Sequence, residues 1–233
     1  MCQIESQVTA SGYLLGSIIM MRDFGLSWFF PKEHEHGSYI ETLRENADLD
    51  GKKFRQVLNY YFPNGSFSPR RVLDICAGVA PEEPELVNRF QINEHELISI
   101  EKERDFVDLA EQIGRKTVVQ GNLSDSNFVR SLEGSFDLCV GRNVPLNPNK
   151  SNEPDPEWTN IFCNINEKIS SHGRVMVTML RKDEFDVARA LFVRAGYDVV
   201  VCEQNPFPVP SNIVGVAEPM KDKYILIAQK NVA

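Results

Sequence analysis

The stretch "RRVLDICAGVAPEEPEL" at residues 70–86 carries the residue types most able to do chemistry. It starts as an apolar strand that contains Asp74 and bends at small residues around Gly78. Three glutamates follow the bend: Glu82, Glu83 and Glu85. A dinucleotide needs backbone amides and a helix N-terminus aimed at its pyrophosphate, and carboxylates at about 4 Å would repel that anion by on the order of 1 to 4 kcal/mol per pair. The glutamates are therefore expected to favour a ligand with a cationic end over NAD or a nucleoside triphosphate.

The backbone of this loop has one glycine where cofactor loops often carry two or three. Cys76 is expected to end its strand with ordinary backbone angles, which would make further glycines unnecessary. Pro84 suits the first position of a helix and is costly one turn further in. A helix is therefore expected to begin near Pro84, after a longer loop than usual.

The elements that must position this loop alternate between short β-branched runs and amphipathic stretches. The predicted strands cover residues 71–76, 97–101, 116–120, 136–141 and 174–180. Apolar residues at helical spacing predict helices over 102–113 and 183–195. Near-continuous apolar strands joined by helices are typical of a parallel sheet that is covered on both faces.

The chain ends differently, with apolar runs at 197–205 and 223–230 joined by a proline-rich connection without a helix. Such a connection indicates an antiparallel pair, since a parallel return needs a crossover. Before residue 70 the pattern is helical, with a stripe that ends at "PNG", residues 63–65. The sequence thus predicts an α/β fold: a doubly wound, mostly parallel seven-stranded sheet with an antiparallel last strand. An N-terminal helical cap over 1–69 would precede a cofactor-binding domain over 70–233.

Composition limits the partners. The 233 residues carry a formal charge of −8, which gives no drive toward nucleic-acid phosphates. Five widely spaced cysteines, at positions 2, 76, 139, 163 and 202, favour reduced core residues in a cytoplasmic protein over a disulfide framework. The apolar stretch at 13–21 is too short to span a bilayer and has no export signature, so no membrane association is expected.

Residues 70–230 resemble the class I S-adenosylmethionine-dependent methyltransferases. The resemblance rests on "VLDICAG", on the acidic end of "LISIE", on "VVQGN", on "FDLCVG" and on the reversed last strand. It implies S-adenosylmethionine as the cofactor. By position, Asp74, Cys76, Ala77 and Gly78 would line its methionine end. Glu101 would accept hydrogen bonds from both ribose hydroxyls, and Asn122 with Leu123 would meet the adenine, the Asn122 carbonyl suiting an exocyclic amine. Lys102 and Gly141 complete the expected cofactor site.

Catalytic groups are less clearly marked. The segment "GRNVPLNPN" at 141–149 follows the fourth predicted strand, where this family places acceptor groups. Asn143 loosely matches the signature of amino-methylating members, although a simple loop near the substrate fits as well. His34 and His36 in the expected cap could act as a base or as metal ligands, or lie in a surface loop; two histidines without a third ligand make a weak metal signal, and no metal is predicted.

The resemblance implies methyl transfer to a small or medium-sized acceptor molecule. This reaction is an in-line displacement, in which the protein chiefly holds donor and acceptor close and collinear. Two alternatives stay open: an aminopropyl or aminocarboxypropyl transferase on the same fold, and a non-catalytic binding protein that has lost the cofactor. Part of the loop at 205–220, together with the cap around residues 13–39, is expected to wall the acceptor site. The alternative is that its side chains pack on the neighbouring helices or on the N-terminal cap.

Overall fold

The computed structural model describes residues 36–146, 155–210 and 220–231. The helices are α2 (His36–Tyr61), α3 (Glu83–Phe90), the short 3-10 helix η4 (Glu94–Glu96), α4 (Arg104–Gln112), α5 (Ser126–Ser131), α6 (Pro156–Lys168) and α7 (Lys182–Arg194). The strands are β1 (Val72–Ile75), β2 (Leu97–Glu101), β3 (Val118–Gln120), β4 (Phe136–Gly141), β5 (Ile169–Met179), β6 (Tyr197–Gln204), β7 (Val209–Pro210), β8 (Met220–Lys221) and β9 (Tyr224–Lys230).

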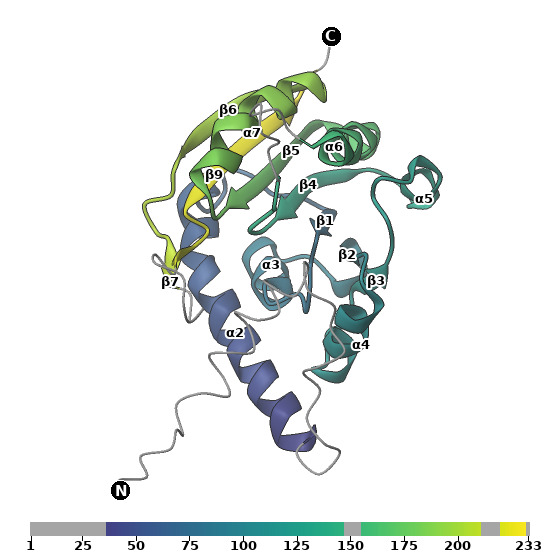
Figure 1. Cartoon of the computed structure of the whole chain (residues 1–233), viewed down its shortest axis with the longest axis vertical. Helices are drawn as coiled ribbons and strands as arrows, with labels where there is room; N and C mark the ends of the chain where they lie inside the picture. Colours follow the sequence, from purple (N-terminus) through teal and green to yellow (C-terminus); the bar gives the residue numbers. More distant parts are fainter. Residues whose placement is uncertain (1–35, 147–154, 211–219, 232–233) are drawn as a thin grey trace, which may run out of the picture.

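Seven of these strands form one sheet in the order β3-β2-β1-β4-β5-β9-β6 (Figure 1). Strands β1 to β5 pair in parallel, and β9 runs antiparallel to both β5 and β6. The predicted mostly parallel sheet with a reversed last strand is therefore confirmed. The reversed strand lies between β5 and β6, which leaves β6 at one edge and β3 at the other.

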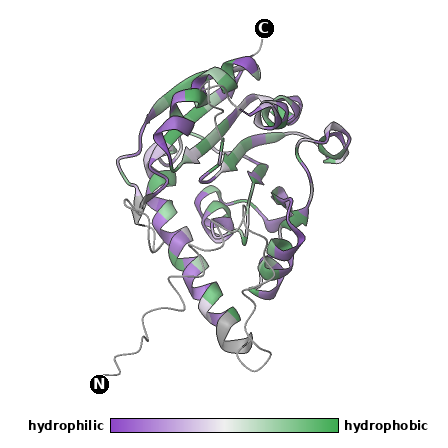
Figure 2. Ribbon diagram, viewed as in Figure 1, coloured by the Kyte–Doolittle hydropathy of each residue, from purple (hydrophilic) through white to green (hydrophobic). Residues whose placement is uncertain are grey.

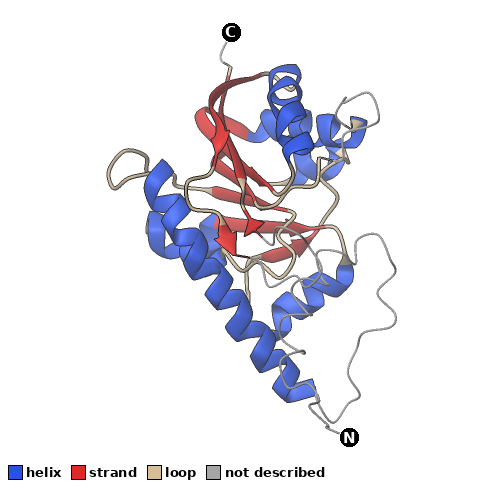
Figure 3. Cartoon of the chain, turned by 60° about the vertical axis from the view of Figure 1, so that its left-hand side comes forward, coloured by secondary structure: helices blue, strands red, loops and turns tan. Residues whose placement is uncertain are grey.

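Helices cover both faces of the sheet (Figure 3). On one face, α2 and α3 form a hydrophobic cluster with β1, β4, β5 and β9, centred on buried residues such as Phe54, Leu86 and Val140. On the other face, α5, α6 and α7 pack on the same strands through residues such as Val129, Phe162 and Leu191. Figure 2 shows hydrophobic residues concentrated along the central strands, as expected for a sheet buried on both sides.

Helix α2 makes up most of the described part of the expected N-terminal cap. Its predicted apolar stripe is buried at Phe54, Val57 and Leu58, and the helix ends at Tyr61, just before "PNG". Its side chains share a hydrophobic cluster with the sheet, so this helix packs as part of the α/β layer structure. The division of the chain between residues 69 and 70 stays a prediction.

The local boundaries follow the sequence signals closely. Helix α3 begins at Glu83 with Pro84 in its first turn, as expected. The helices expected at 102–113 and 183–195 are α4 and α7. Within the described ranges no helix is long and apolar enough to cross a membrane, and no group of three or more His, Cys, Asp or Glu side chains is arranged to hold a metal ion.

Candidate cofactor site

A cavity of about 220 Å³ opens at the carboxyl ends of β1, β2 and β3, beside the start of α6. Its apolar walls are Ile100, Leu123, Pro145, Trp158 and Ile161. Its polar and charged residues are Glu101, Lys102, Glu103, Asn122 and Glu157, and Cys76 and Gly121 complete the lining. Parallel sheets bind ligands at this edge, next to the strand where the order reverses, so the cavity lies where a cofactor is expected.

Five of the nine residues predicted to bind the cofactor line this cavity: Cys76, Glu101, Lys102, Asn122 and Leu123. The other four surround the same strand ends without lining it. Asp74 is fully buried, Ala77 packs against α4, and Gly78 lies in the loop after β1. Gly141 ends β4, where an added Cβ would come within 2.8 Å of side-chain atoms of both Ile75 and Val144, so tight packing accounts for this glycine.

The carboxylate of Glu101 is engaged by three backbone amides. Gly78 N–H donates to Oε2 at 2.8 Å, and the N–H groups of Lys102 and Glu103 donate to Oε1 at 2.8 and 3.0 Å. A carboxylate has about four lone-pair sites, so roughly one remains for a further donor. Glu101 therefore ties the loop after β1 to the end of β2, and it retains capacity for about one of the two ribose hydroxyls expected from the sequence.

Asn122 lies in a tight turn after β3. Its Oδ1 accepts hydrogen bonds from Ser124 N at 3.0 Å and Ser124 Oγ at 2.8 Å. Asn164 of α6 holds the same turn by donating to the carbonyls of Leu123 and Ser124. The carbonyl oxygen expected to meet an exocyclic amine is thus already occupied by two donors, which corrects the sequence-based rationale for this residue.

The backbone of the loop after β1 also differs from expectation. Cys76 has a φ of +54°, Gly78 of +56° and Ala80 of +46°, so the prediction of ordinary angles at Cys76 was wrong. A non-glycine residue in this left-handed region costs about 1 to 2 kcal/mol. Hydrogen bonds hold the loop in place: Ala77 N–H donates to the Ile100 carbonyl, and Ala80 N–H to the Ala77 carbonyl.

The three glutamates after the bend have protein partners, which corrects their expected role toward a cationic ligand. Glu83 accepts from Thr117 Oγ1 at 2.6 Å, and Glu85 forms a bidentate pair with Arg55 of α2 at 2.5 and 2.9 Å. Glu82 is buried and accepts from Arg142 at 3.2 Å. These carboxylates join α3 to its neighbours, because α2, the residue before β3 and the residue after β4 supply cationic or hydroxyl donors that the sequence pattern does not reveal.

Arg142, directly after β4, is the centre of a buried ion network that sequence reasoning missed. Its guanidinium pairs with Asp222 at 2.6 Å, Asp50 at 3.1 Å and Glu82 at 3.2 Å, and it lies 4.3 Å from the centre of the Phe54 ring. Burial alone would lower the pKa of this guanidinium, but the three carboxylates raise it well above its usual value. Burial raises the pKa of Asp50, yet Arg142 and Lys221 outweigh it and lower that pKa overall.

Comparison with known proteins identifies the fold. Neither a family model nor a curated protein sequence matches the chain, but solved structures do. An S-adenosylmethionine-dependent methyltransferase from Clostridium acetobutylicum has a TM-score of 0.55 at 9% identity, covering 86% of this chain and 100% of that one. DesVI from Streptomyces venezuelae has a TM-score of 0.53 at 11% identity, covering 87% of this chain and 100% of that one. The glycopeptide N-methyltransferase MtfA has a TM-score of 0.52 at 14% identity, covering 77% of this chain and 94% of that one. The chain has the class I methyltransferase fold.

In this fold the loop after β4 carries Asn143, one of the candidate catalytic residues. Its backbone N–H donates to Thr178 Oγ1 at 2.9 Å, and its Oδ1 accepts from Asp222 N at 2.8 Å. Asn143 therefore links the end of β4 to β5 and to the turn before β9, outside the cavity lining. Its catalytic role stays a prediction. His34 lies outside the described residues, and of His36 the structure describes the backbone as the first residue of α2.

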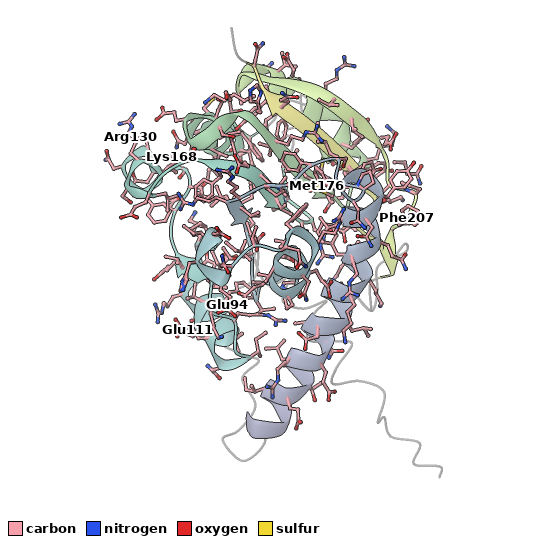
Figure 4. All side chains as sticks on the ribbon, turned by 180° about the vertical axis from the view of Figure 1, so that it is seen from behind. Glu94, Glu111, Arg130, Lys168, Met176 and Phe207 are labelled. Atoms are coloured by element: carbon pink, nitrogen blue, oxygen red, sulfur yellow. The ribbon has the colours of Figure 1, made fainter. Side chains whose placement is uncertain are left out.

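The loop expected to wall the acceptor site is described at its two ends. Phe207 lies beside the C-terminal end of α2 (Figure 4), where its ring centre is 5.2 Å from that of Tyr60. Residues 211–219 lie outside the described residues. The described beginning of the loop thus packs on α2, which was the alternative expectation for this segment, and the hypothesis of an acceptor wall stays a prediction.

Helix α6 supplies three of the seven cavity residues that sequence reasoning missed, namely Glu157, Trp158 and Ile161. A local signal for this helix exists. Asp155 caps it by accepting from Glu157 N at 2.8 Å, and Pro156 occupies the first turn, a pairing typical of helix starts. That signal locates the helix, whereas its contact with the cavity depends on how α6 packs against β4.

Proposed function

We propose that this protein transfers a methyl group from S-adenosylmethionine to a small or medium-sized acceptor. The observation that carries the proposal is the cavity at the ends of β1 to β3, which combines an acidic strand end, an amide and an aromatic wall. A diol fits a carboxylate at a strand end, and an aromatic base fits an apolar slot that includes Trp158. The fold supports the same reading, since the neighbouring structures include S-adenosylmethionine-dependent methyltransferases.

The residues present are chemically suited to the adenosine part of the cofactor. Glu101 would accept from a ribose hydroxyl, while Trp158, Ile161 and Leu123 would enclose the base. Cys76 would lie toward the methionine part, because it lines the cavity at the end of β1. The cofactor supplies an electrophilic methyl group on a sulfonium, so the protein's task is to orient the two reactants and to exclude water. A general base is required only where the acceptor must lose a proton.

Calorimetry with S-adenosylmethionine and S-adenosylhomocysteine tests cofactor use directly. Binding of both ligands with one-to-one stoichiometry is the expected result, and NAD should give no heat. Incubation with methyl-labelled S-adenosylmethionine and panels of amine and hydroxyl acceptors then tests transfer. Identification of the sulfur product separates methyl transfer from aminopropyl or aminocarboxypropyl transfer, since those reactions leave a different thioether.

A non-catalytic binding protein is the second candidate, and one observation favours it. Two of the three left-handed positions in the loop after β1 carry side chains, at Cys76 and Ala80. In addition, the carboxylate of Glu101 accepts three hydrogen bonds from backbone N–H groups. Both features would reduce what the loop offers to a ligand. Failure of S-adenosylhomocysteine to bind the intact protein at millimolar concentration would favour this candidate and count against methyl transfer.

A further inference from the structure

The amide of Asn122 has a fixed orientation. Its side chain faces the backbone N–H of Ser124 at 3.0 Å and the Ser124 hydroxyl at 2.8 Å. A backbone N–H can only donate, so the atom that faces it must be the amide oxygen rather than the nitrogen. The neighbouring turn is held by Asn164, which donates to the carbonyls of Leu123 and Ser124. The two sides of the Asn122 amide are therefore distinguishable.

The remaining side of the amide is a pure donor. Asn122 lines the cavity and is half-buried. Its oxygen already accepts two hydrogen bonds, while its Nδ2 carries two hydrogens for which the described part of the chain provides no partner. An acidic side chain in this place would present acceptors to the cavity, and Asn122 presents donors.

We propose that Asn122 selects the base of the bound nucleoside by donating from Nδ2 to a ring nitrogen of adenine. This inference rests on the proposed function and specifies how its base subsite reads the ligand. Adenine has ring nitrogens that accept hydrogen bonds, and replacing one of them with a C–H group removes that acceptor while preserving the ring's shape. Loss of one good hydrogen bond in a confined site corresponds to roughly a tenfold loss of affinity.

The test measures binding of S-adenosylhomocysteine and of its 1-deaza, 3-deaza and 7-deaza analogues to the intact protein and to Asn122→Asp. The Asp variant keeps an oxygen for Ser124 and loses the donor. One deaza analogue should bind the intact protein about tenfold more weakly than the parent compound, and Asn122→Asp should bind the parent and that analogue equally. Equal binding of all four ligands by the intact protein overturns the donor role. Absence of S-adenosylhomocysteine binding overturns the proposed function and this role together.

A second inference concerns Asp74 and is independent of any ligand. Asp74 of β1 is fully buried, and neither of its carboxylate oxygens has a hydrogen-bond donor among the described residues. Its neighbour on β2 is Ser99, whose hydroxyl is 3.0 Å from Thr117 Oγ1. Thr117 has one hydroxyl hydrogen, which it donates to Glu83 at 2.6 Å. Thr117 can therefore only accept from Ser99, which leaves Ser99 no hydrogen for Asp74.

The neighbouring cation, Arg142, is also committed. The guanidinium of Arg142 donates hydrogen bonds to Asp50, Glu82 and Asp222. Glu82 adjoins Asp74, but two ionised carboxylates offer each other only acceptors. A buried ionised carboxylate without a donor costs several kcal/mol. One proton placed between the two groups converts this repulsion into a hydrogen bond.

We infer that Asp74 and Glu82 share one proton, which Asp74 carries, and that this pair joins the end of β1 to the turn before α3. Burial and then the charge of Glu82 raise the pKa of Asp74 well above its usual value, while the charge of Arg142 opposes the rise. On β4, burial and then Asp74 raise the pKa of the Cys139 thiol, so this neighbour stays neutral. The remaining charged groups of the network, Asp50, Lys221 and Asp222, bond to Arg142 or to one another.

Ionisation of the pair would make the folded protein less stable as pH rises. The folded pKa of Asp74 is raised, so its contribution to stability is fully present below the unfolded pKa of about 3.9 and is lost as pH rises through the folded pKa. Asn at this position is neutral at every pH and can donate to Glu82. The stability of Asp74→Asn should therefore depend less on pH, as pH rises above about 3.9, than that of the unchanged protein.

Infrared spectroscopy detects the proton itself, through the carbonyl stretch of a protonated carboxylic acid. The spectra are taken a unit above the pKa of Glu184, which burial raises to about 7, so that Glu184 is ionised. The intact protein should show this band, Asp74→Asn should lose it, and the control Asp50→Asn should keep it, because the pKa of Asp50 is lowered. Absence of the band from the intact protein, or its persistence in Asp74→Asn, overturns the shared proton.

Discussion

At the residue scale, Glu101 combines two tasks in one carboxylate. Its oxygens accept from the backbone N–H groups of Gly78, Lys102 and Glu103, and the residue lines the cavity at the end of β2. The sequence predicts that Glu101 binds the ribose. The structure adds a second role, which is to fix the loop after β1. Removing the carboxylate should affect both folding and ligand binding.

We expect Glu101→Ala to lower the free energy of unfolding by about 2 to 3 kcal/mol, because three amides lose a charged acceptor. Affinity for S-adenosylhomocysteine should fall at least tenfold. Glu103→Ala is the matched control, because Glu103 lines the same cavity but has an exposed side chain. The free energy of unfolding of this variant should stay within about 0.5 kcal/mol of that of the intact protein. Denaturant unfolding and calorimetry measure the two quantities. Equal stability of the two variants would contradict the structural role of Glu101.

At the element scale, the approach of α2 to the turn before α3 depends on one glycine inside a helix. Gly51 lies in α2, where glycine is normally unfavourable by about 1 kcal/mol relative to alanine. A Cβ added at Gly51 would come within 2.1 Å of the Pro81 carbonyl oxygen. Close packing of the helix against that backbone therefore outweighs local helix propensity, and it brings Asp50 to Arg142.

Gly51→Ala should accordingly destabilise the protein by roughly 1 to 3 kcal/mol, as overpacking against rigid backbone does. Asn59→Ala provides the control in the same helix, at an exposed position, where alanine should stabilise by about 0.5 kcal/mol. Opposite signs are thus expected for the two substitutions in denaturant unfolding. A gain in stability with Gly51→Ala would show that α2 does not approach the Pro81 turn this closely.

At the scale of the whole molecule, Arg142 connects segments that are far apart in the sequence. Its partners come from α2, from the turn before α3 and from the turn before β9, at separations of 92, 60 and 80 residues. A buried cation with three carboxylates leaves uncompensated negative charge when it is removed. The network should therefore contribute to the stability of the assembled fold, unlike the exposed ion pairs at its surface.

Arg142→Met should lower the free energy of unfolding by about 3 to 5 kcal/mol, the range for breaking a buried ion pair from one side. Arg130→Met is the control, because Arg130 pairs with Glu167 at 3.4 Å where both side chains are more than half exposed, at 61% and 53%; its effect should be below about 0.5 kcal/mol. Both are measured by denaturant unfolding. A loss of less than 1 kcal/mol in Arg142→Met would contradict the importance of the network.

The sequence by itself determined the features that depend on neighbouring residues. Hydrophobic periodicity and turn residues are local, so they located the parallel strands, the reversed last strand, α4 and α7, and the start of α3 near Pro84. Strand ends are also local, and this is why five of the nine predicted cofactor residues line one cavity. The position of Asn122 in a turn is local too. Which atom of its amide faces Ser124, and which stays available, is decided by the tertiary structure.

The tertiary structure alone decided which side chains meet. The left-handed angles at Cys76 and Ala80 occur in a loop that is held by hydrogen bonds to β2 and within itself, which residue type did not indicate. The fold pairs Glu82 with Arg142, Glu83 with Thr117 and Glu85 with Arg55. It also places β9 between β5 and β6 in the sheet. Such contacts join residues that are tens of positions apart, and packing and charge pairing select them from many that the same local patterns would allow.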